Sequence, residues 1–192
     1  MTAFALWSAN AAAQPVTVRD AFGREVTVPA PPQRIVTIFA SNTEMVVALG
    51  LANRIVGIEA FTRFPPEVLG KPLVGGRLGF SVDAVVDRKP DLVVVTPARQ
   101  AANQLVEPME RLGIPVLVLV HRRVPEILHN IRLLGKVCGV PERGEALAAE
   151  LQARLDKVEK ARQEQAARDE AARLARQEEE RKRLEADKLA EK

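Results

Sequence analysis

Three closely spaced glycines are the first residues in this sequence whose pattern could bind a ligand. Gly75, Gly76 and Gly79 lie in the stretch VGGRLGFSVDAVVDRKPDLVVV, residues 74–95, between two apolar segments. A dinucleotide-binding loop needs the spacing G-x-G-x-x-G and an acidic residue about 20 positions further on. This loop has the spacing G-G-x-x-G, no acidic residue follows at that distance, and the chain has no G-K-[ST] phosphate loop. The sequence therefore predicts no nucleotide site.

Residues that could catalyse a reaction or hold a metal ion are few. His121 and His129 are the only histidines and fall in no spacing typical of zinc sites, and the chain has no G-x-S-x-G nucleophile motif. Cys138, the single cysteine, excludes an internal disulfide and a multi-cysteine metal site. It falls on the apolar side of a predicted helix, which favours a small core residue, and His129 falls on the polar side of that helix. We therefore predict no enzyme, no resident metal and no cofactor.

The elements that must position any site alternate between apolar strands and helices. Strands are predicted at residues 34–40, 54–60, 72–76, 91–95 and 114–120, and helices at residues 41–50, 81–88, 99–113 and 125–139. Continuous apolar strands between helices are typical of a parallel sheet that is covered on both faces. A β-hairpin is predicted at residues 16–28, where alternating residues flank Gly23. The expected fold class is α/β, a Rossmann-like parallel-sheet lobe with an N-terminal β-hairpin and a long C-terminal α-helix.

Local signals predict where these helices begin and end. Ser41 is a favourable N-cap, and Glu44 three residues later would complete a capping box. Gly50 is placed to end the same helix. Pro125 suits a first helical turn, whereas Pro108 falls inside a helix that we expect it to bend.

The composition and the N-terminal residues indicate an exported chain. Of the 192 residues 47% are apolar, and the net charge of +3, from 28 basic and 25 acidic residues, gives no argument for a nucleic-acid partner. Residues 3–7 are apolar and small residues follow, so Ala11, Ala12 and Ala13 predict a signal-peptide cleavage site with Gln14 as the new N-terminus. We expect residues 1–13 to be a signal-peptide remnant and residues 14–140 to form the α/β lobe. No run reaches the roughly 20 apolar residues that span a bilayer.

The remaining residues, 141–192, read as one long charged helix. An apolar stripe of Leu147, Leu151, Leu155 and Val158 ends there, and residues 161–192 contain nine basic and nine acidic residues. Acidic residues precede basic ones by four positions at 164–168, 169–173, 178–182 and 179–183. Each such pair stabilises a helix by about 0.2–0.5 kcal/mol. A coiled coil needs apolar positions sustained over several heptads, and after the stripe only leucines 174, 184 and 189 remain, so a solvated helix is favoured.

Side chains that follow the predicted strands are the candidates for ligand binding, because ligands of open α/β sheets bind beyond the carboxyl ends of the strands. The predicted ligand-binding residues are Phe61, Arg63, Arg77, Phe80, Arg99 and His121. Guanidinium groups pair with carboxylates and other oxyanions, and phenylalanine offers a flat apolar contact. Such an edge suits an anionic, partly aromatic ligand. The alternative is that these arginines are scattered, solvated charges.

The motifs of residues 16–158 resemble those of a known family. They run in order through RDAFGREVTVPAPPQRIVTI, NTEMVVALGLANRIVGI, FPPEVLGKPLVGG, SVDAVVDRKPDLVVV, LGIPVLVL and IRLLGKVCGVPERGEAL. The chain is similar to the N-terminal lobe of periplasmic binding proteins for iron complexes or cobalamin, the class whose two lobes are joined by a long backbone helix. The resemblance implies a periplasmic, ligand-delivering component of an ABC importer. It implies a siderophore, haem or cobalamin as ligand and the ABC permease as partner, with no contact to the membrane except through the transporter.

The resemblance also implies roles for single residues. An acidic residue on the helix before the RKPDLVVV strand docks the transporter in this family, and Asp83 holds that position, with Asp87 one turn later. An acid in a first helical turn is also favoured by the helix dipole alone. Phe61 keeps an aromatic position of the cobalamin binders, but Arg77 and Thr96 stand where that branch has tryptophan. This departure favours an anionic iron complex, a ferric siderophore or haem, over cobalamin.

The C-terminal part departs further from the family. Its backbone helix should continue into a second α/β lobe, whereas here the charged helix follows instead, so we expect half of the binding cleft to be missing and ligand binding by the lone lobe to be weak. The rival interpretation is an interaction or adaptor protein that binds no ligand. In it the lobe would dock a partner, and the helix, about 70 Å long at 1.5 Å per residue, would act as a spacer or an oligomerisation arm.

Overall fold

The computed structural model describes residues 14–76, 79–96 and 99–190, and the chain divides into two compact units. The first unit is Met1–Ala148 and the second is Ala149–Lys192. The predicted cleavage site at residues 11–13 lies outside the described residues, as does Arg77. No helix in the described ranges is apolar over a length that would cross a membrane.

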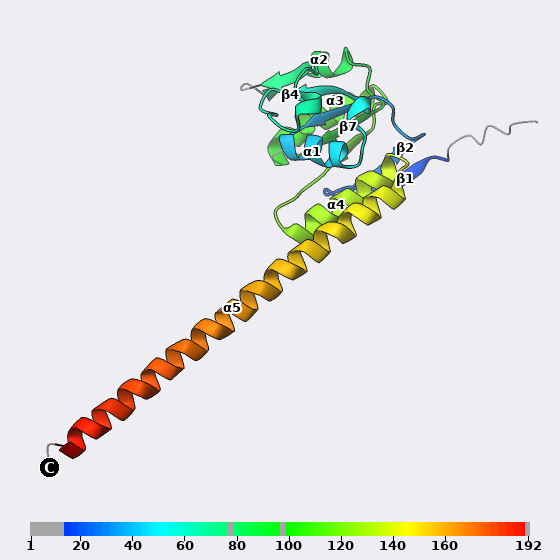
Figure 1. The fold of residues 1–192 in the computed structure, drawn as a ribbon. Helices are drawn as coiled ribbons and strands as arrows, with labels where there is room; N and C mark the ends of the chain where they lie inside the picture. Colours follow the sequence, from blue (N-terminus) through cyan, green and yellow to red (C-terminus); the bar gives the residue numbers. More distant parts are fainter. Residues whose placement is uncertain (1–13, 77–78, 97–98, 191–192) are drawn as a thin grey trace, which may run out of the picture. The chain divides into compact units, whose positions relative to one another are not determined.

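The first unit contains a six-stranded sheet with the strand order β6-β5-β4-β3-β7-β8, of which β4 and β7 are labelled in Figure 1. The strands are β3 (Ile35–Ile38), β4 (Ile55–Glu59), β5 (Leu73–Gly76), β6 (Gly79–Phe80), β7 (Leu92–Val95) and β8 (Val116–Val118). All neighbours pair in parallel except β5 and β6, which form a short antiparallel ladder. The chain adds strands on one side of β3 and then turns to the other side with β7. The parallel sheet predicted from the apolar runs is confirmed, and β6 is a strand that the sequence did not predict.

Helices cover both faces of this sheet. On one face α2 (Val82–Val86) and α3 (Arg99–Arg111) contact each other and enclose a cluster of buried side chains with strands β3, β5, β7 and β8. On the other face α1 (Ala40–Ala48) contacts α4 (Val124–Val137). Every residue of β3 and β7 is buried, as a strand covered on two faces must be. The short 3₁₀ helices η1 (Ala52–Arg54) and η2 (Pro66–Val68) lie in the connections on either side of β4.

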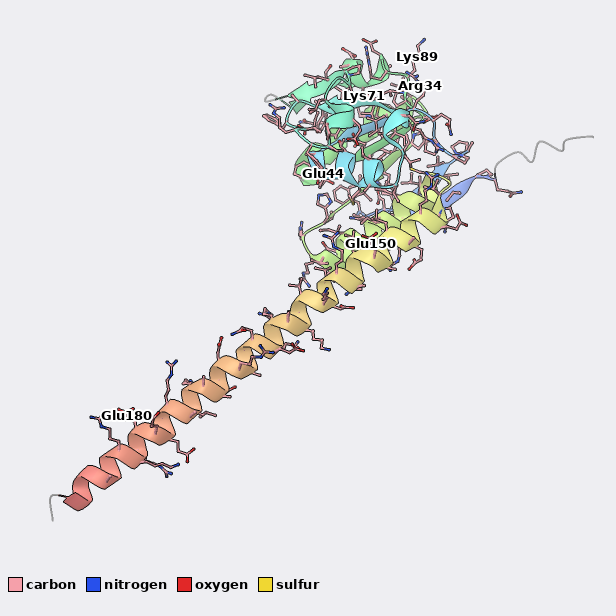
Figure 2. The ribbon with its side chains drawn as sticks, viewed as in Figure 1. Arg34, Glu44, Lys71, Lys89, Glu150 and Glu180 are labelled. Carbon is pink, nitrogen blue, oxygen red and sulfur yellow. The ribbon has the colours of Figure 1, made fainter. Side chains whose placement is uncertain are left out.

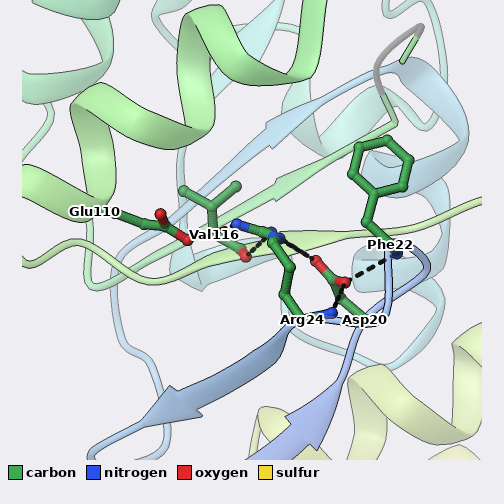
Figure 3. A network of polar contacts seen from close by, with 5 residues as sticks. All are labelled: Asp20, Phe22, Arg24, Glu110 and Val116. Atoms are coloured by element: carbon green, nitrogen blue, oxygen red, sulfur yellow. Dashed lines mark hydrogen bonds and ion pairs between the residues drawn. The ribbon is translucent and has the colours of Figure 1, made fainter.

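The predicted hairpin consists of β1 (Val16–Arg19) and β2 (Glu25–Val28), and its turn is joined to the edge strand β8. The backbone N–H of Ala21 donates to the carbonyl of Val118 at 3.0 Å. The guanidinium of Arg24 donates to the Val116 carbonyl at 3.0 Å and pairs with the Asp20 carboxylate (Figure 3). Asp20 is fully buried as a side chain and also accepts the backbone N–H groups of Phe22 and Arg24. Hydrogen bonds to a buried carboxylate therefore fix the turn against the sheet.

Helix α4 packs closely on the start of α5 (Pro141–Ala190) through two glycines. A Cβ atom on Gly135 would lie 2.8 Å from the Cα of Gly144, and one on Gly144 would lie 3.1 Å from the Cα of Gly135. Beside this crossing Arg132 forms two hydrogen bonds with the Glu145 carboxylate, at 2.7 and 3.1 Å. Cys138 ends α4 and is fully buried, and burial raises the pKa of its thiol to about 12, so the expected core role is confirmed.

The second unit is the remainder of α5, a single helix whose side chains project on all sides (Figure 2). Its ion pairs are Glu159–Arg162 at 2.9 Å, Glu170–Arg173 at 3.7 Å and Glu178–Lys182 at 3.0 Å. Of the four acid-first pairs expected at a spacing of four, only Glu178–Lys182 is an ion pair among the described residues. Arg173 pairs with Glu170 instead of Asp169. Leu155 and Val158 of the apolar stripe are exposed. The helix is continuous, as the absence of proline and glycine predicts.

One predicted helix start is wrong. Helix α1 begins at Ala40 with Phe39 at the N-cap, and no side chain caps it. Ser41 lies inside the helix, so it forms no capping box with Glu44, because its hydroxyl is bonded to a distant part of the chain. Gly50 does follow the end of α1 with a φ of +77°, and Pro108 lies within α3 as expected.

Removal of the buried carboxylate should loosen the hairpin. We expect Asp20→Ala to lower the free energy of unfolding by about 2–3 kcal/mol, because it leaves Arg24 and two backbone N–H groups without their acceptor. Glu110→Ala removes the exposed partner of Arg24 and should cost less than about 1 kcal/mol. Urea unfolding followed by circular dichroism measures both values. Equal losses for the two variants would show that burial of Asp20 contributes nothing.

Candidate functional site

The candidate site lies at the carboxyl ends of β3 and β7, two adjacent parallel strands between which the direction of strand addition reverses. In open α/β sheets this switch point leaves a crevice in which ligands bind. The residues that follow β3 form the first turn of α1, Thr96 follows β7, and His121 comes from the segment after β8. Three separate parts of the first unit therefore contribute to one edge.

Buried polar side chains hold the first turn of α1 on the strand ends. The Asn42 amide nitrogen donates to the Ile38 carbonyl at 2.7 Å and approaches the Thr96 hydroxyl at 3.1 Å, and Asn42 is completely buried. The hydroxyls of Thr37 and Thr43, also completely buried, are hydrogen-bonded at 2.7 Å. Because each buried polar group has a partner, the cost of burying it is offset and the turn is fixed in one geometry.

This geometry places Phe39 in a strained backbone conformation. Its φ is 93°, which a residue with a Cβ rarely adopts, and such strain costs roughly 1–3 kcal/mol. Its carbonyl accepts the N–H groups of Asn42 and Thr43 at 3.0 and 3.4 Å, so this residue caps the first turn of α1. The phenyl side chain is 53% exposed. A strained backbone that presents an aromatic ring to solvent is a feature of binding sites rather than of a stable core.

His121 lies beside Phe39, with the two ring centroids 5.9 Å apart and tilted by 52°. Its Nε2 atom is 2.6 Å from the Ser41 hydroxyl, and its Nδ1 atom is buried without a hydrogen-bond partner among the described residues. Burial lowers the pKa of His121 from its usual 6.5, although the nearby Glu126 carboxylate opposes this shift. The neutral imidazole is therefore favoured. A proton on Nε2, donated to Ser41, avoids burying an unpaired N–H at Nδ1.

The segment after β4 adds two more exposed aromatic rings. Phe61 and Phe64 are 58% and 62% exposed, and the Glu59 carboxylate anchors their loop by accepting the Phe61 N–H at 2.8 Å and the Thr62 hydroxyl at 2.9 Å. Arg63 donates to the carbonyls of Ala60 and Thr62, at 2.7 and 3.3 Å. Its guanidinium thus folds back on its own loop, and only its remaining N–H groups could meet an anion.

The other predicted ligand-binding residues are less informative. Phe80 is half-buried against the core cluster beneath α2 and α3. Arg99 is the first residue of α3, and its side chain, like the whole of Arg77, lies outside the described part of the structure. In the described ranges no three acidic, histidine or cysteine side chains are grouped so that they could hold a metal ion.

Phe39 is the residue of this edge that the sequence did not suggest. It ends the apolar run 34–40 and reads as a buried strand residue, because nothing in its neighbours signals a positive φ. The sequence predicted that Ser41 caps α1, whereas its hydroxyl bonds His121, which lies 80 residues away. A useful signal would have been the clustering of small polar residues directly after an apolar strand, in the stretch FASNT.

Helix α2 carries the two predicted docking residues. The Ser81 hydroxyl accepts the Ala84 N–H at 3.2 Å and caps the helix, and Val85 is completely buried beneath it. Asp83 and Asp87 are both exposed. The helix therefore presents two carboxylates to solvent, as expected, while its role in docking stays a prediction.

Comparisons with known proteins identify a family model and several relatives that match this chain. The family model described as a periplasmic binding protein matches residues 35–182. The uncharacterized ABC transporter substrate-binding lipoprotein YvrC of Bacillus subtilis (strain 168) is 29% identical over 147 residues, 76% of this chain and 46% of that protein. A vitamin B12-binding protein of Vibrio campbellii is 29% identical over 126 residues, 66% of this chain and 46% of that protein. The chain spans about half the length of the curated relatives it matches.

A similar fold is found in solved structures. The crystal structure of the haem-binding protein HmuT superimposes with a TM-score of 0.63 at 25% identity, covering 76% of this chain and 47% of that one. Together these matches confirm the α/β fold class and the resemblance that the sequence motifs indicated.

The half-buried His121 should make stability depend on pH. Because the pKa of His121 is lower in the folded chain than the unfolded value of 6.5, the unfolded chain binds the proton more tightly. The contribution of His121 is complete above pH 6.5 and is lost as the pH falls through 6.5 towards the lower pKa of the folded state. We expect the midpoint of thermal unfolding, followed by circular dichroism, to fall less between about pH 7.5 and about pH 5.5 in His121→Asn than in the parent.

The control for this measurement is His129→Asn, since His129 is exposed and should leave the pH dependence unchanged. If the unfolding midpoint of His121→Asn falls with pH as much as that of the parent, the lowered pKa of His121 is contradicted.

Proposed function

The chain belongs to the periplasmic binding protein family, and we propose on that basis that it is a substrate-binding component of an ABC importer that takes up an iron complex, with haem as the first candidate. The proposed site is the edge formed by Phe39, His121, Phe61 and Phe64. The protein binds and delivers its ligand outside the cytoplasmic membrane, in the periplasm, and is not an enzyme. The observation that carries the proposal is the pairing of an exposed aromatic ring, Phe39, with the neutral imidazole of His121 at the switch point of the sheet.

A flat, largely apolar metal complex matches this edge in two ways. The three phenyl rings are more than half exposed, and covering them would contribute about 25 cal/mol per Å² of apolar surface removed from water. A neutral imidazole nitrogen is a common ligand of haem iron. Coordination of iron through Nε2 of His121 would require the ring proton to move to Nδ1 and the hydrogen bond to Ser41 to break, so both changes would set part of the cost of binding. The haem-binding neighbour and the vitamin B12-binding relative both carry macrocyclic ligands, which supports this class of ligand.

The positive charges of nearby arginines favour an anionic complex as the ligand. Arg63 stands beside Phe61 and Phe64 with N–H groups left over from its contacts to the loop. In the sequence Arg77 follows β5 and Arg99 comes shortly after β7, and we propose that both contribute to binding of the anionic ligand. Cobalamin is the alternative ligand in the same family, and a ferric siderophore is the other anionic iron complex.

Binding of haem can be tested directly by absorption titration. We expect haem added to the parent to shift its Soret band, and His121→Ala to weaken binding about tenfold or more, because the metal–nitrogen bond is lost. His129→Ala removes the other, exposed histidine and should leave the affinity within about twofold; a tenfold change is about 1.4 kcal/mol. Parallel titrations with cyanocobalamin and ferrichrome separate the three ligand classes. Equal haem affinity in both variants and the parent would reject His121 as a ligand.

We further propose that Asp83 and Asp87 form the surface that contacts the importer. Both carboxylates are exposed, and the capped and buried side of α2 holds them in place. Charge complementarity with basic residues on the permease would speed and orient the encounter.

Reversal of this charge should reduce binding to the permease. We expect Asp83→Lys to lower the amount of protein that binds to vesicles containing the cognate permease, with a thermal unfolding midpoint close to that of the parent. Glu150→Lys, which reverses an exposed charge in the second unit, is the matched control. If Asp83→Lys instead unfolds the first unit, the carboxylate serves the dipole of α2 and not a partner. Normal binding by a folded Asp83→Lys would support the rival adaptor interpretation, in which other surfaces bind partners.

A further inference from the structure

A second pocket lies in the first unit, between the hairpin turn and the N-terminal part of α4. Its volume is about 770 Å³, within the range of small-molecule sites. None of Phe39, Ser41, His121, Phe61 or Phe64 lines it. The lining of this pocket is therefore distinct from the edge to which the proposed function assigns the iron complex, and Val120 and Arg122 in its wall are the chain neighbours of His121.

The carboxylates in the wall of this pocket are already engaged within the protein. Asp20 is buried and binds the Arg24 guanidinium and two backbone N–H groups. One oxygen of Glu126 accepts the backbone N–H groups of Arg122 and Arg123, at 2.6 and 3.2 Å. The charge of Asp20 is balanced by Arg24, whereas Glu126 keeps its charge and is held in place by backbone donors. Both carboxylates fix the shape of the wall, and two arginines of the same wall outnumber the one uncompensated carboxylate.

Two arginine side chains supply the charge that a ligand can reach. Arg19, at the end of β1, and Arg122, just before α4, both line the pocket and are exposed. Neither guanidinium forms an ion pair within the described ranges, in contrast to Arg24. His129 adds an exposed imidazole to the same wall. A guanidinium that no protein carboxylate occupies is a donor for a carboxylate, sulfonate or phosphate.

The rest of the wall is apolar and firmly held. Val120, Pro125 and Leu133 line it together with Ala21 of the hairpin turn. Asn130, which is 4% exposed, donates its amide nitrogen to the Val120 carbonyl at 2.8 Å and ties α4 to the segment after β8. Arg24 and Ala21 tie the hairpin turn to β8. Both sides of the pocket are thus attached to the same strand, and the pocket is formed before any ligand arrives.

We propose that this pocket binds a small organic anion, an acidic group carried on an apolar body. The acidic group pairs with Arg19 and Arg122, and the body packs on Val120, Pro125 and Leu133. This site goes beyond the proposed function, because it shares no residue with the iron-complex edge and predicts a ligand that contains no metal.

Two fluorescent probes with nearly the same body test the proposal. The anion 8-anilino-1-naphthalenesulfonate carries a sulfonate, and N-phenyl-1-naphthylamine lacks it. We expect the folded parent to bind the sulfonate in a saturable, one-to-one manner and the uncharged probe about tenfold more weakly. The double variant Arg19→Gln/Arg122→Gln should bind the sulfonate only as weakly as the uncharged probe, whose own affinity should stay unchanged. The variant Ala21→Trp fills the pocket and should lose both probes.

Three controls make the result specific. Arg111→Gln removes an exposed arginine outside the pocket and should keep parental affinity for the sulfonate. Phe39→Ala, at the other edge, should also keep it, so a failure of the proposed haem site would leave this result untouched. Circular dichroism of each variant verifies the fold. Parental sulfonate affinity in the folded double variant, full binding by a folded Ala21→Trp, or loss of binding in Phe39→Ala would overturn the proposal.

Discussion

The buried amide of Asn42 is the contact on which the candidate site depends. It bonds the carbonyl that ends β3 and the hydroxyl that follows β7, so it joins the two strands at the point where the sheet changes direction. A buried amide without these partners would cost several kcal/mol, and for this reason the first turn of α1 has a single favourable position. In this turn Phe39 has a φ of 93° and the Ser41 hydroxyl is bonded to His121. Hydrogen bonds of the surrounding turn offset the strain at Phe39.

From this fixed turn the properties of the edge follow. The Phe39 ring cannot withdraw into the core, since its backbone is held, and the rings of Phe61 and Phe64 are kept outward by the Glu59 carboxylate under their loop. His121 is kept neutral by burial and is restrained by one hydroxyl. The edge therefore presents exposed aromatic rings beside a neutral imidazole. The proposed function uses these rings to cover one face of a large, flat ligand, and the chain belongs to the periplasmic binding protein family.

Internal use of carboxylates shapes the other end of the unit. Asp20 accepts backbone N–H groups and pairs with Arg24, which bonds β8 and so attaches the hairpin to it, and Glu126 accepts the backbone N–H groups just before α4. Arg19 and Arg122 have no carboxylate partner in an ion pair within the described ranges. A second consequence concerns packing, because the contact of Gly135 with Gly144 brings α4 and the start of α5 together more closely than any side chain would allow. Beyond Ala148 the helix relies on local ion pairs, which contribute only a few tenths of a kcal/mol each.

The sequence by itself determined the elements and their class. Apolar runs of strand length, a capping serine at Ser81, and glycines at 23 and 50 are local signals, and local signals predicted the sheet, the hairpin, α2 and the long charged helix. The sequence also carried enough of the family pattern to indicate a binding lobe. Only the tertiary structure decided what each side chain touches. Ser41 bonds His121, 80 residues away, instead of capping α1. Arg63 bonds its own loop, and Phe39 is exposed from a backbone with positive φ. Local sequence patterns do not encode contacts between distant segments or the φ of a single residue. The pocket beside α4 likewise depends on three distant segments meeting at β8, which no pattern in any one of them encodes.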